Sequence, residues 1–356
     1  MSTVRLRGEA IRKYIIDNIE AHPSDIAKMA AEKFGLTRQA VNKHLQNMVT
    51  SGAIKSKSGK TRNRQYELTP LAQWTRLYSI GSPGVVEDVV WRNDVRPILV
   101  GLPDNVLDIW EYCFTEMFNN AIDHSAGTMI SVFLDKTAAS TKIAILDNGV
   151  GIFKKIQSEM NLLDERQAIL ELAKGKLTTD PRRHTGEGVF FTSRMLDSFD
   201  ILSGGVFFTH QFGDDEDWIV ERSKPDDDGT FVIMKLHNHT ARTSKEIFDS
   251  FSGGDNYGFV KTVVPVKLAQ YGNDKLISRS QAKRLLTRVE QFKIVIFDFN
   301  GVEFIGQAFA DEIFRVFANS HPEMALLPAN ANREVQHMIE RAKAIINTET
   351  TDRYPE

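Results

Sequence analysis

The chain has very little cysteine and no long apolar run. Cys113 is the only cysteine among 356 residues, which excludes an internal disulfide framework and a cysteine-rich zinc site. No stretch of about 18 residues is uninterruptedly apolar, so the sequence predicts no transmembrane helix. The first residues carry charges every few positions and lack the apolar core of a signal peptide. These absences predict a protein of the reducing cytoplasm with no membrane attachment.

Length and charge indicate several domains with different partners. The chain is 42% hydrophobic and 26% charged, as folded globular proteins are, and its 356 residues exceed what one core usually holds. Residues 1–78 contain 14 Lys and Arg against 6 Asp and Glu, a charge of +8. The remaining 30 basic and 41 acidic residues carry −11. A basic segment on an acidic body suggests that this segment alone meets a polyanion.

Three short helices are predicted within the first 50 residues. Apolar residues recur at helical spacing in three segments: 11–19, 26–34 and 40–48. Ser24 is expected to cap the second helix, Gly35 to end it, and Thr37 to cap the third. The third helix would turn four polar side chains outward: Arg38, Gln39, Asn42 and Lys43. The tight connection at residues 35–37 is typical of a helix-turn-helix.

A hairpin rich in cations follows these helices. Two short strands are predicted at 53–54 and 66–68, and between them the chain carries five cations: Lys55, Lys57, Lys60, Arg62 and Arg64. Residues 1–75 therefore resemble a winged helix-turn-helix domain, an α+β fold. The resemblance implies that the third helix enters the major groove of double-stranded DNA and reads base edges, while the five wing cations hold phosphates.

A long helix predicted over residues 105–125 carries the first part of a nucleotide motif. Glu116, Asn120 and Asp123 are spaced i, i+4 and i+7 and share a face that differs from the apolar face of the helix. A carboxylate and a carboxamide one turn apart can serve a water molecule and a hydrated Mg²⁺ together, because that ion takes few protein ligands.

Two glycine motifs follow this helix. A strand predicted at 141–146 runs into Asp147-Asn148-Gly149-Val150-Gly151, where the carboxylate can accept an exocyclic amine and the glycines let a flat ligand approach the backbone. The second motif, Gly186-Glu187-Gly188-Val189, opens a helix whose free N–H groups suit phosphates. Between the motifs, a charged helical stretch is predicted over 157–174, and Arg182 and Arg183 stand on the polar loop after it, where they could close over a triphosphate.

Residues 80–240 therefore resemble the GHKL ATPase superfamily, which includes gyrase-type ATPases, Hsp90, MutL, histidine kinases and anti-sigma-factor kinases. The resemblance implies a Bergerat α/β sandwich that binds ATP and Mg²⁺. It gives Glu116 the role of catalytic acid, Asn120 that of magnesium ligand and Thr230 a place beside adenine. The motifs and the resemblance together assign these residues to the nucleotide: Asn120, Asp123, Asp147, Gly149, Gly151, Arg182, Arg183, Gly186, Gly188, Val189 and Thr230.

The use of ATP stays open at this point. A histidine autokinase is not expected, because no phospho-accepting histidine on a long dimerising helix precedes the nucleotide motifs. His124 is expected to end its helix rather than act in catalysis. A slow Mg²⁺-dependent ATPase, a Ser/Thr protein kinase of the anti-sigma-factor type and an ATP-gated switch all remain.

The last third of the chain alternates predicted strands and helices, among them a strand at 259–268 and a helix at 308–318, which indicates a small α/β domain over residues 256–350. The strand predicted at 293–299, its loop and the following helix resemble the centre of a STAS domain, as in anti-sigma-factor antagonists. Where those carry a phosphorylatable Asp-Ser-Ser-Gly, this chain has Gly306-Gln307-Ala308-Phe309. We therefore expect a STAS-like unit that docks a protein partner without accepting phosphate.

These parts together predict a cytoplasmic, DNA-binding and ATP-binding regulator that could form a homodimer. In this hypothesis a GHKL nucleotide switch controls a winged helix and a STAS-like unit. The alternative is an enzyme first, either a Ser/Thr kinase or a GHKL ATPase, whose winged helix docks proteins.

Overall fold

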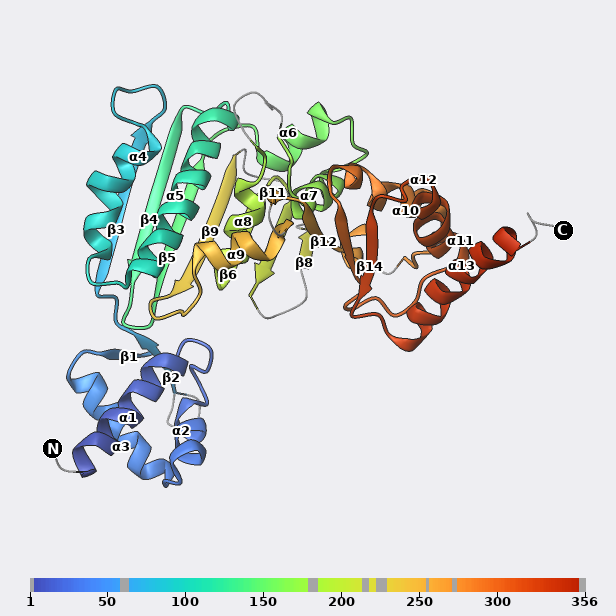
Figure 1. Cartoon of the computed structure of the whole chain (residues 1–356). Coiled ribbons are helices and arrows are strands. Elements are labelled where there is room, and N and C mark those ends of the chain that lie inside the picture. Colours follow the sequence, from blue (N-terminus) through green and yellow to red (C-terminus); the bar gives the residue numbers. More distant parts are fainter. Residues whose placement is uncertain are drawn as a thin grey trace.

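The computed structural model describes residues 3–57, 64–178, 185–212, 218–221, 229–253, 256–270 and 274–351. Three units follow one another along the chain (Figure 1): an N-terminal unit of helices and a hairpin, a central unit on a seven-stranded sheet and a C-terminal unit on a three-stranded sheet. Within these ranges, no helix combines the length and the apolar character needed to cross a membrane.

The N-terminal unit contains the three predicted helices and the predicted hairpin. Its elements are α1 (Thr3–Asn18), α2 (Ile26–Phe34), α3 (Arg38–Thr50), β1 (Ile54–Lys57) and β2 (Gln65–Leu68). Gly35 ends α2 with a φ of 60°, and the Thr37 hydroxyl caps α3 by accepting a bond from the Ala40 N–H at 3.2 Å. The cap predicted at Ser24 was wrong. The backbone N–H of Met29 bonds to the Asp25 carbonyl, so α2 begins one residue later.

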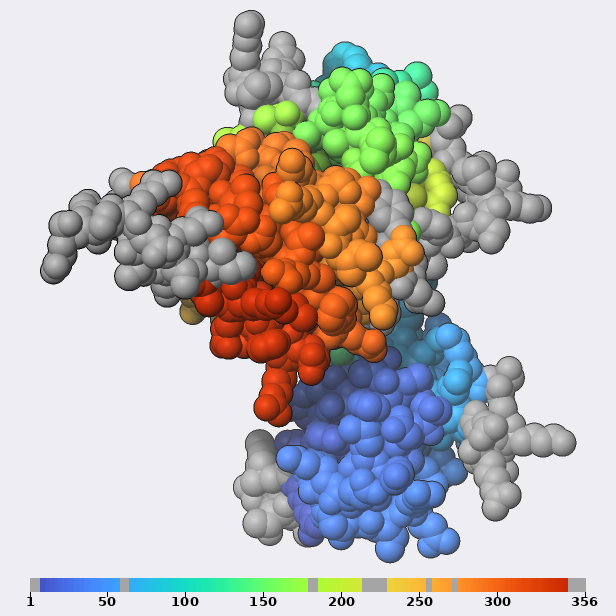
Figure 2. Space-filling model, turned by 90° about the vertical axis from the view of Figure 1, so that its right-hand side faces the viewer, coloured from blue at the N-terminus to red at the C-terminus, as the bar shows by residue number. Residues whose placement is uncertain are grey.

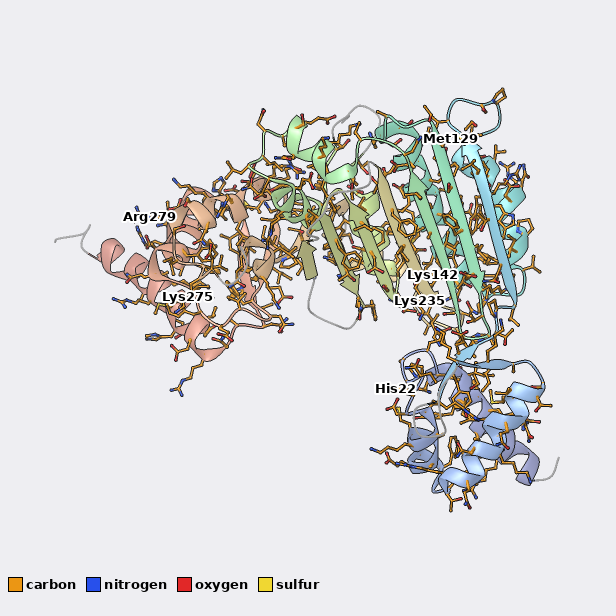
Figure 3. All side chains as sticks on the ribbon, turned by 180° about the vertical axis from the view of Figure 1, so that it is seen from behind. His22, Met129, Lys142, Lys235, Lys275 and Arg279 are labelled. Atoms are coloured by element: carbon orange, nitrogen blue, oxygen red, sulfur yellow. The ribbon has the colours of Figure 1, made fainter. Side chains whose placement is uncertain are left out.

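One carboxylate, Glu20, fastens the N-terminal unit to the central sheet. It accepts hydrogen bonds from the hydroxyls of Ser140 at 2.8 Å and Thr137 at 3.0 Å, and pairs with the Lys235 ammonium at 2.7 Å. Burial raises the pKa of Glu20, but the bonds and charge of Lys235 and the two hydroxyls outweigh it and lower the pKa overall. Ala139 of the same turn is buried in the core of the N-terminal unit. Figure 3 shows Lys235 at this junction, near His22.

The central unit is one layer of helices on an antiparallel sheet. The strands are β3 (Ala72–Ser79), β4 (Met129–Lys136), β5 (Ser140–Asp147), β6 (Ser198–Ser203), β7 (Val206–Gln211), β8 (Trp218–Glu221) and β9 (Thr230–His237), in the order β3-β4-β5-β9-β6-β7-β8. The helices are α4 (Glu87–Val90), α5 (Asp104–His124), α6 (Ile152–Glu159), α7 (Glu165–Lys174), α8 (Gly188–Met195) and α9 (Ser244–Phe251). In Figure 1, α4, α5 and α9 lie in front of the sheet, and Figure 3 shows the strands from the opposite side.

Local backbone geometry corrects one prediction in this unit. The helical stretch predicted over 157–174 is two helices, α6 and α7, because Asn161 takes a φ of 52° that no α-helix accommodates. The break matters for the site, since it lets α7 turn away from the sheet and reach the C-terminal unit.

The C-terminal unit is built on a parallel sheet with the order β12-β13-β14. Its elements are β10 (Ser252–Gly253), β11 (Asn256–Phe259), β12 (Lys261–Pro265), α10 (Arg279–Leu286), β13 (Ile294–Asp298), α11 (Gln307–Asp311), α12 (Ala318–Ser320), β14 (Ala325–Ala329) and α13 (Arg333–Thr351). The strand predicted at 259–268 is shorter than expected, because a 3-10 turn begins at Val266. The helix predicted at 308–318 widens into a π-helical turn from Glu312 to Phe317.

Candidate functional site

A cavity of about 390 Å³ lies between the helix layer and the central sheet, within the usual size range of small-molecule sites. α5, α6 and α8 form its walls with the strands β5 and β9. Among its lining residues are seven that the sequence assigned to catalysis or nucleotide binding: Glu116, Asn120, Asp147, Gly186, Gly188, Val189 and Thr230.

One end of the cavity combines Glu116 with the start of α8. A Cβ atom on Gly188 would lie 2.0 Å from Glu116 Oε2, so only glycine lets this carboxylate and the helix start approach each other. Glu187, the residue before α8, does not cap the helix with its side chain. The first N–H groups of α8 therefore have no intrahelical partner and suit an anion.

The other end of the cavity is centred on Asp147, which is only 5% exposed. Its Oδ1 accepts hydrogen bonds from the backbone N–H of Gly149 at 2.9 Å and of Thr230 at 3.2 Å. Burial raises the pKa of Asp147, although these bonds oppose the rise. A Cβ atom on Gly149 would lie 2.1 Å from the Ser125 carbonyl oxygen, so the motif needs glycine for this close packing. The Thr230 hydroxyl in turn accepts a bond from the Ile152 N–H at 3.0 Å, which holds the start of α6.

The distance between the two ends suits an extended ligand. Glu116 and His124 both line the cavity and lie eight residues apart on α5, which is about 12 Å along the helix axis. Asn120 lines the cavity midway between them. The site thus offers a buried acceptor at one end, a carboxamide in the middle, and a carboxylate beside the N–H groups of a helix start at the other end.

Not every residue assigned to the nucleotide lines this cavity. Asp123 is not among the described residues that line the cavity, and its side chain is exposed. Consecutive helix residues are about 100° apart, so the rotation of α5 that turns His124 toward the cavity turns Asp123 toward solvent. Asp123 therefore lies outside the described lining of this cavity. Gly149 and Gly151 lie behind the wall rather than in it; a Cβ atom on Gly151 would meet the Ser203 hydroxyl at 2.7 Å.

Arg182 and Arg183, the two cations expected to close over a triphosphate, lie outside the described residues.

Two lining residues were missed by the sequence analysis. His124 ends α5 as expected, but it also lines the cavity. Lys155 lines the cavity from α6, and its ammonium donates a bond to the His124 carbonyl at 2.8 Å. The signal was present in the sequence, because Lys155 lies one helical turn after Gly151, where the first glycine motif passes into a helix.

The residues present fit a magnesium nucleotide better than a resident metal. The described residues contain no group of three or more His, Cys, Asp or Glu side chains that could hold a metal ion. Mg²⁺ bound together with phosphates keeps several waters and needs only one or two protein ligands. Asn120, one turn from Glu116 and inside the cavity, could provide such a ligand.

The N-terminal unit presents a separate polar surface. On α3, all four residues predicted to read DNA are exposed: Arg38, Gln39, Asn42 and Lys43. In the hairpin, Lys55 and Lys57 are exposed and Arg64 is half-buried, while the predicted wing cations Lys60 and Arg62 lie outside the described residues. The Lys57 ammonium pairs with Glu67 at 2.7 Å, so a phosphate would have to compete for it.

Comparison with known proteins bears on the C-terminal unit alone. Residues 281–336 match the family model of a STAS-like domain of unknown function (DUF4325). The match begins inside α10 and ends inside α13, so the C-terminal unit contains a STAS-like domain. No curated protein matches the chain.

Residues 306–309, predicted to stand where STAS domains carry a phosphorylatable Asp-Ser-Ser-Gly, contain no hydroxyl side chain. Gly306 precedes α11, and Gln307, Ala308 and Phe309 form its first turn, with Phe309 buried.

Proposed function

We propose that the chain is a DNA-binding regulator whose central unit binds Mg²⁺ and ATP in a GHKL-type site. In this proposal the nucleotide state controls a winged helix and the STAS-like domain. A single observation carries the nucleotide part: one cavity holds a buried acceptor, Asp147, at one end and the Glu116–Gly188 contact with the start of α8 at the other.

In this proposal different lining residues would bind different parts of the ligand. Asp147 would accept a hydrogen bond from the exocyclic amine of adenine, since a buried carboxylate is an acceptor only. The first N–H groups of α8 would hold the phosphates. Asn120 would hold Mg²⁺, which when bound neutralises phosphate charge.

Glu116 is placed to orient an attacking nucleophile and to take its proton. The nucleophile would be water in an ATPase and a protein hydroxyl in a kinase. The same carboxylate serves either reaction, so the geometry of the cavity is common to both.

Labelled ATP distinguishes the uses of the site. We expect the full chain, incubated with Mg²⁺ and γ-labelled ATP, to bind the nucleotide and to release labelled phosphate slowly without becoming labelled. Parallel incubations with and without double-stranded DNA would show whether DNA alters the release. Label transferred to protein would replace the switch with the kinase alternative, and no binding at all would contradict the proposal.

Substitutions on the N-terminal unit test DNA binding. Replacing Lys55, Lys57 and Arg64 with Ala should weaken binding to all sequences and lower the slope of log affinity against log salt by about two to three, because each lost phosphate contact removes about 0.9. Replacing Arg38 and Gln39 with Ala should change sequence preference instead, by about 1–3 kcal/mol per lost base contact. Fluorescence anisotropy over a salt titration measures both effects.

The control for this test is Lys28→Ala. Lys28 is an exposed lysine of α2 that pairs with Glu32 at 4.0 Å and belongs to neither surface. An unchanged affinity and salt slope in the hairpin variant would contradict DNA binding by this unit.

A further inference from the structure

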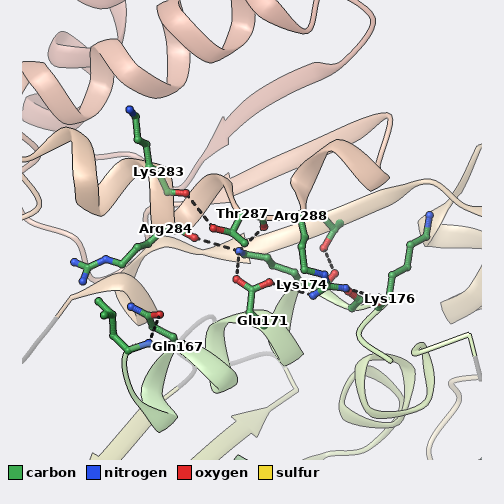
Figure 4. A network of polar contacts seen from close by, with 11 residues as sticks. Gln167, Glu171, Lys174, Lys176, Lys283, Arg284, Thr287 and Arg288 are labelled. Atoms are coloured by element: carbon green, nitrogen blue, oxygen red, sulfur yellow. Dashed lines mark hydrogen bonds and ion pairs between the residues drawn. The ribbon is translucent and has the colours of Figure 1, made fainter. Parts of the chain in front are cut away.

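A buried network of charges joins the central unit to the STAS-like domain (Figure 4). Its first part is an ion pair within α7: the Lys174 ammonium lies 2.7 Å from Glu171 Oε1, and the two side chains are 1% and 3% exposed. The second carboxylate oxygen of Glu171 pairs with Arg288 at 3.1 Å, from the other side of the junction. Figure 2 shows the two partners in contact at the surface, the C-terminal unit in orange against the α6–α7 segment in green.

Lys174 also completes the end of a helix that belongs to the STAS-like domain. Its ammonium donates to the carbonyl oxygens of Thr287 at 2.8 Å and Arg284 at 3.4 Å, at the C-terminal end of α10. The last carbonyls of a helix have no intrahelical partner and carry a partial negative charge, so a cation there is favourable. A residue of the central unit therefore bonds the Thr287 carbonyl just past α10 and shares the Arg284 carbonyl with the Thr287 N–H.

Side chains of the C-terminal unit also donate hydrogen bonds to the backbone at the end of α7 and just after it. The Thr262 hydroxyl donates to the Lys174 carbonyl at 2.7 Å. The Arg288 guanidinium donates to the carbonyls of Gly175, at 3.4 Å, and of Lys176. Three consecutive carbonyls are thus held by side chains from the C-terminal unit. Arg288 has a φ of 60°, an unusual conformation for arginine that brings its side chain to this junction.

The segment held in this way continues directly into the wall of the cavity. Leu177 and Thr178, the next two residues, line the cavity, as does Leu172 of α7. The Leu177 N–H donates to the Gly186 carbonyl at 3.1 Å. Gly186 also lines the cavity, just before the start of α8, and a Cβ atom on it would lie 2.4 Å from the Leu177 carbonyl carbon. A shift of the segment would therefore move both this wall and the phosphate end.

We infer that the STAS-like unit positions one wall of the nucleotide cavity through Lys174, Arg288 and Thr262, which act as positioning residues and not as ligands. The inference rests on the proposed nucleotide site. A buried ion pair is a weak source of stability, since apolar replacements of similar volume are often neutral or stabilising. Hydrogen bonds fix the directions of the three successive carbonyls of Lys174, Gly175 and Lys176, whereas apolar contacts would not fix them.

Thr262 allows the sharpest test, because it lies on β12, in the C-terminal unit, and touches the segment through one hydrogen bond. Thr262→Val keeps the side-chain shape and removes the bond, whereas Thr262→Ser keeps the hydroxyl. We expect Thr262→Val to raise the Kd for Mg²⁺-ATP about fivefold or more, the lower range of typical coupling between sites, and Thr262→Ser to restore affinity close to that of the parent. Isothermal titration calorimetry on the full chain measures both.

A second variant removes the Glu171–Lys174 ion pair; Arg288 loses its carboxylate partner but keeps its bonds to the carbonyls of Gly175 and Lys176. Glu171→Gln combined with Lys174→Met should weaken Mg²⁺-ATP binding by at least the same factor and speed amide exchange at residues 175–178. The matched control is Lys136→Met, since Lys136 also bonds two carbonyls, of Ile98 at 3.3 Å and Val100 at 3.0 Å, but lies on β4. We expect that control to bind ATP as the parent does.

The outcomes separate the two proposals. A parent chain that fails to bind ATP overturns the nucleotide site and the inference with it. A parent that binds ATP, together with Thr262→Val and Glu171→Gln/Lys174→Met variants that are folded and bind equally well, overturns the inference alone. Weaker binding in these variants, with thermal midpoints close to that of the parent, supports positioning over a merely structural role.

Discussion

Asp147→Asn is expected to remove detectable ATP binding, which makes it the largest effect that we predict. The amide would keep Oδ1 as the acceptor for the N–H groups of Gly149 and Thr230, and would place its NH₂ where the second carboxylate oxygen was. An NH₂ group would then face the exocyclic amine of adenine, donor against donor. Sites built around a hydrogen bond reject ligands that cannot pair by about 10⁴-fold or more. Calorimetric titration with ATP measures the loss.

Loss of fold is not expected to explain that result. Burial raises the pKa of Asp147, so the folded chain holds this proton more tightly than the unfolded chain does. Ionisation at neutral pH therefore costs folding free energy, and the neutral amide avoids that cost. The thermal midpoint of Asp147→Asn should equal or exceed that of the parent. Asp135→Asn, on the neighbouring strand β4, is the control and should bind ATP normally. Normal ATP binding by Asp147→Asn itself would contradict the assignment of Asp147 to adenine.

Glu116→Ala is expected to separate binding from turnover. The variant should bind ATP with nearly the affinity of the parent, because Asp147 and the N–H groups of α8 remain. Phosphate release should fall by about 10²–10⁴-fold, the usual loss when a group that transfers a proton in the reaction is removed. Calorimetry and a phosphate-release assay on the same preparation measure the two quantities.

Glu111→Ala provides the comparison for this variant. Glu111 is an exposed carboxylate on the same helix, outside the described lining of the cavity, so its removal should change neither quantity. Turnover by Glu116→Ala at the rate of the parent would remove Glu116 from the chemistry and leave the cavity as a binding site only.

Local sequence signals predicted most of the elements, and seven of the residues that they assigned to catalysis or to the nucleotide line one cavity. Gly35 and Thr37 mark helix boundaries because capping depends on neighbouring backbone alone. The glycine motifs were informative for a similar reason. Gly149 and Gly188 occupy places where a Cβ atom would collide with backbone or with Glu116, so the residue type itself reports the close approach.

The sequence was silent wherever residue roles depend on packing between distant segments. Asp123 shares the spacing of Glu116 and Asn120, but the rotation of α5 against the sheet decides which side meets the cavity. Lys174 reads as one more cation in a charged helix, although its side chain is fully buried. Two of its partners, the carbonyls of Arg284 and Thr287, lie more than 100 residues away. Periodicity cannot report such contacts, because they exist only once the C-terminal unit has folded against α7.

The Glu20 junction determines which part of the molecule can serve as a fixed frame. β5 runs from Ser140, bonded to Glu20, to Asp147, about 24 Å away at the usual rise of a strand. β9 runs back from Thr230 to Lys235, which also bonds Glu20. Both strands that form the Asp147 end of the cavity are therefore anchored, at their far ends, on the N-terminal unit, which carries the exposed surface of α3.

On the opposite wall of the cavity, the described polar contacts of α7 fasten it to the STAS-like domain instead. In the proposed mechanism a nucleotide that draws this wall inward would leave α3 and the sheet fixed during the conformational change. The C-terminal unit would rotate relative to the sheet and the N-terminal unit. Any protein docked on it would then move relative to the DNA bound by α3.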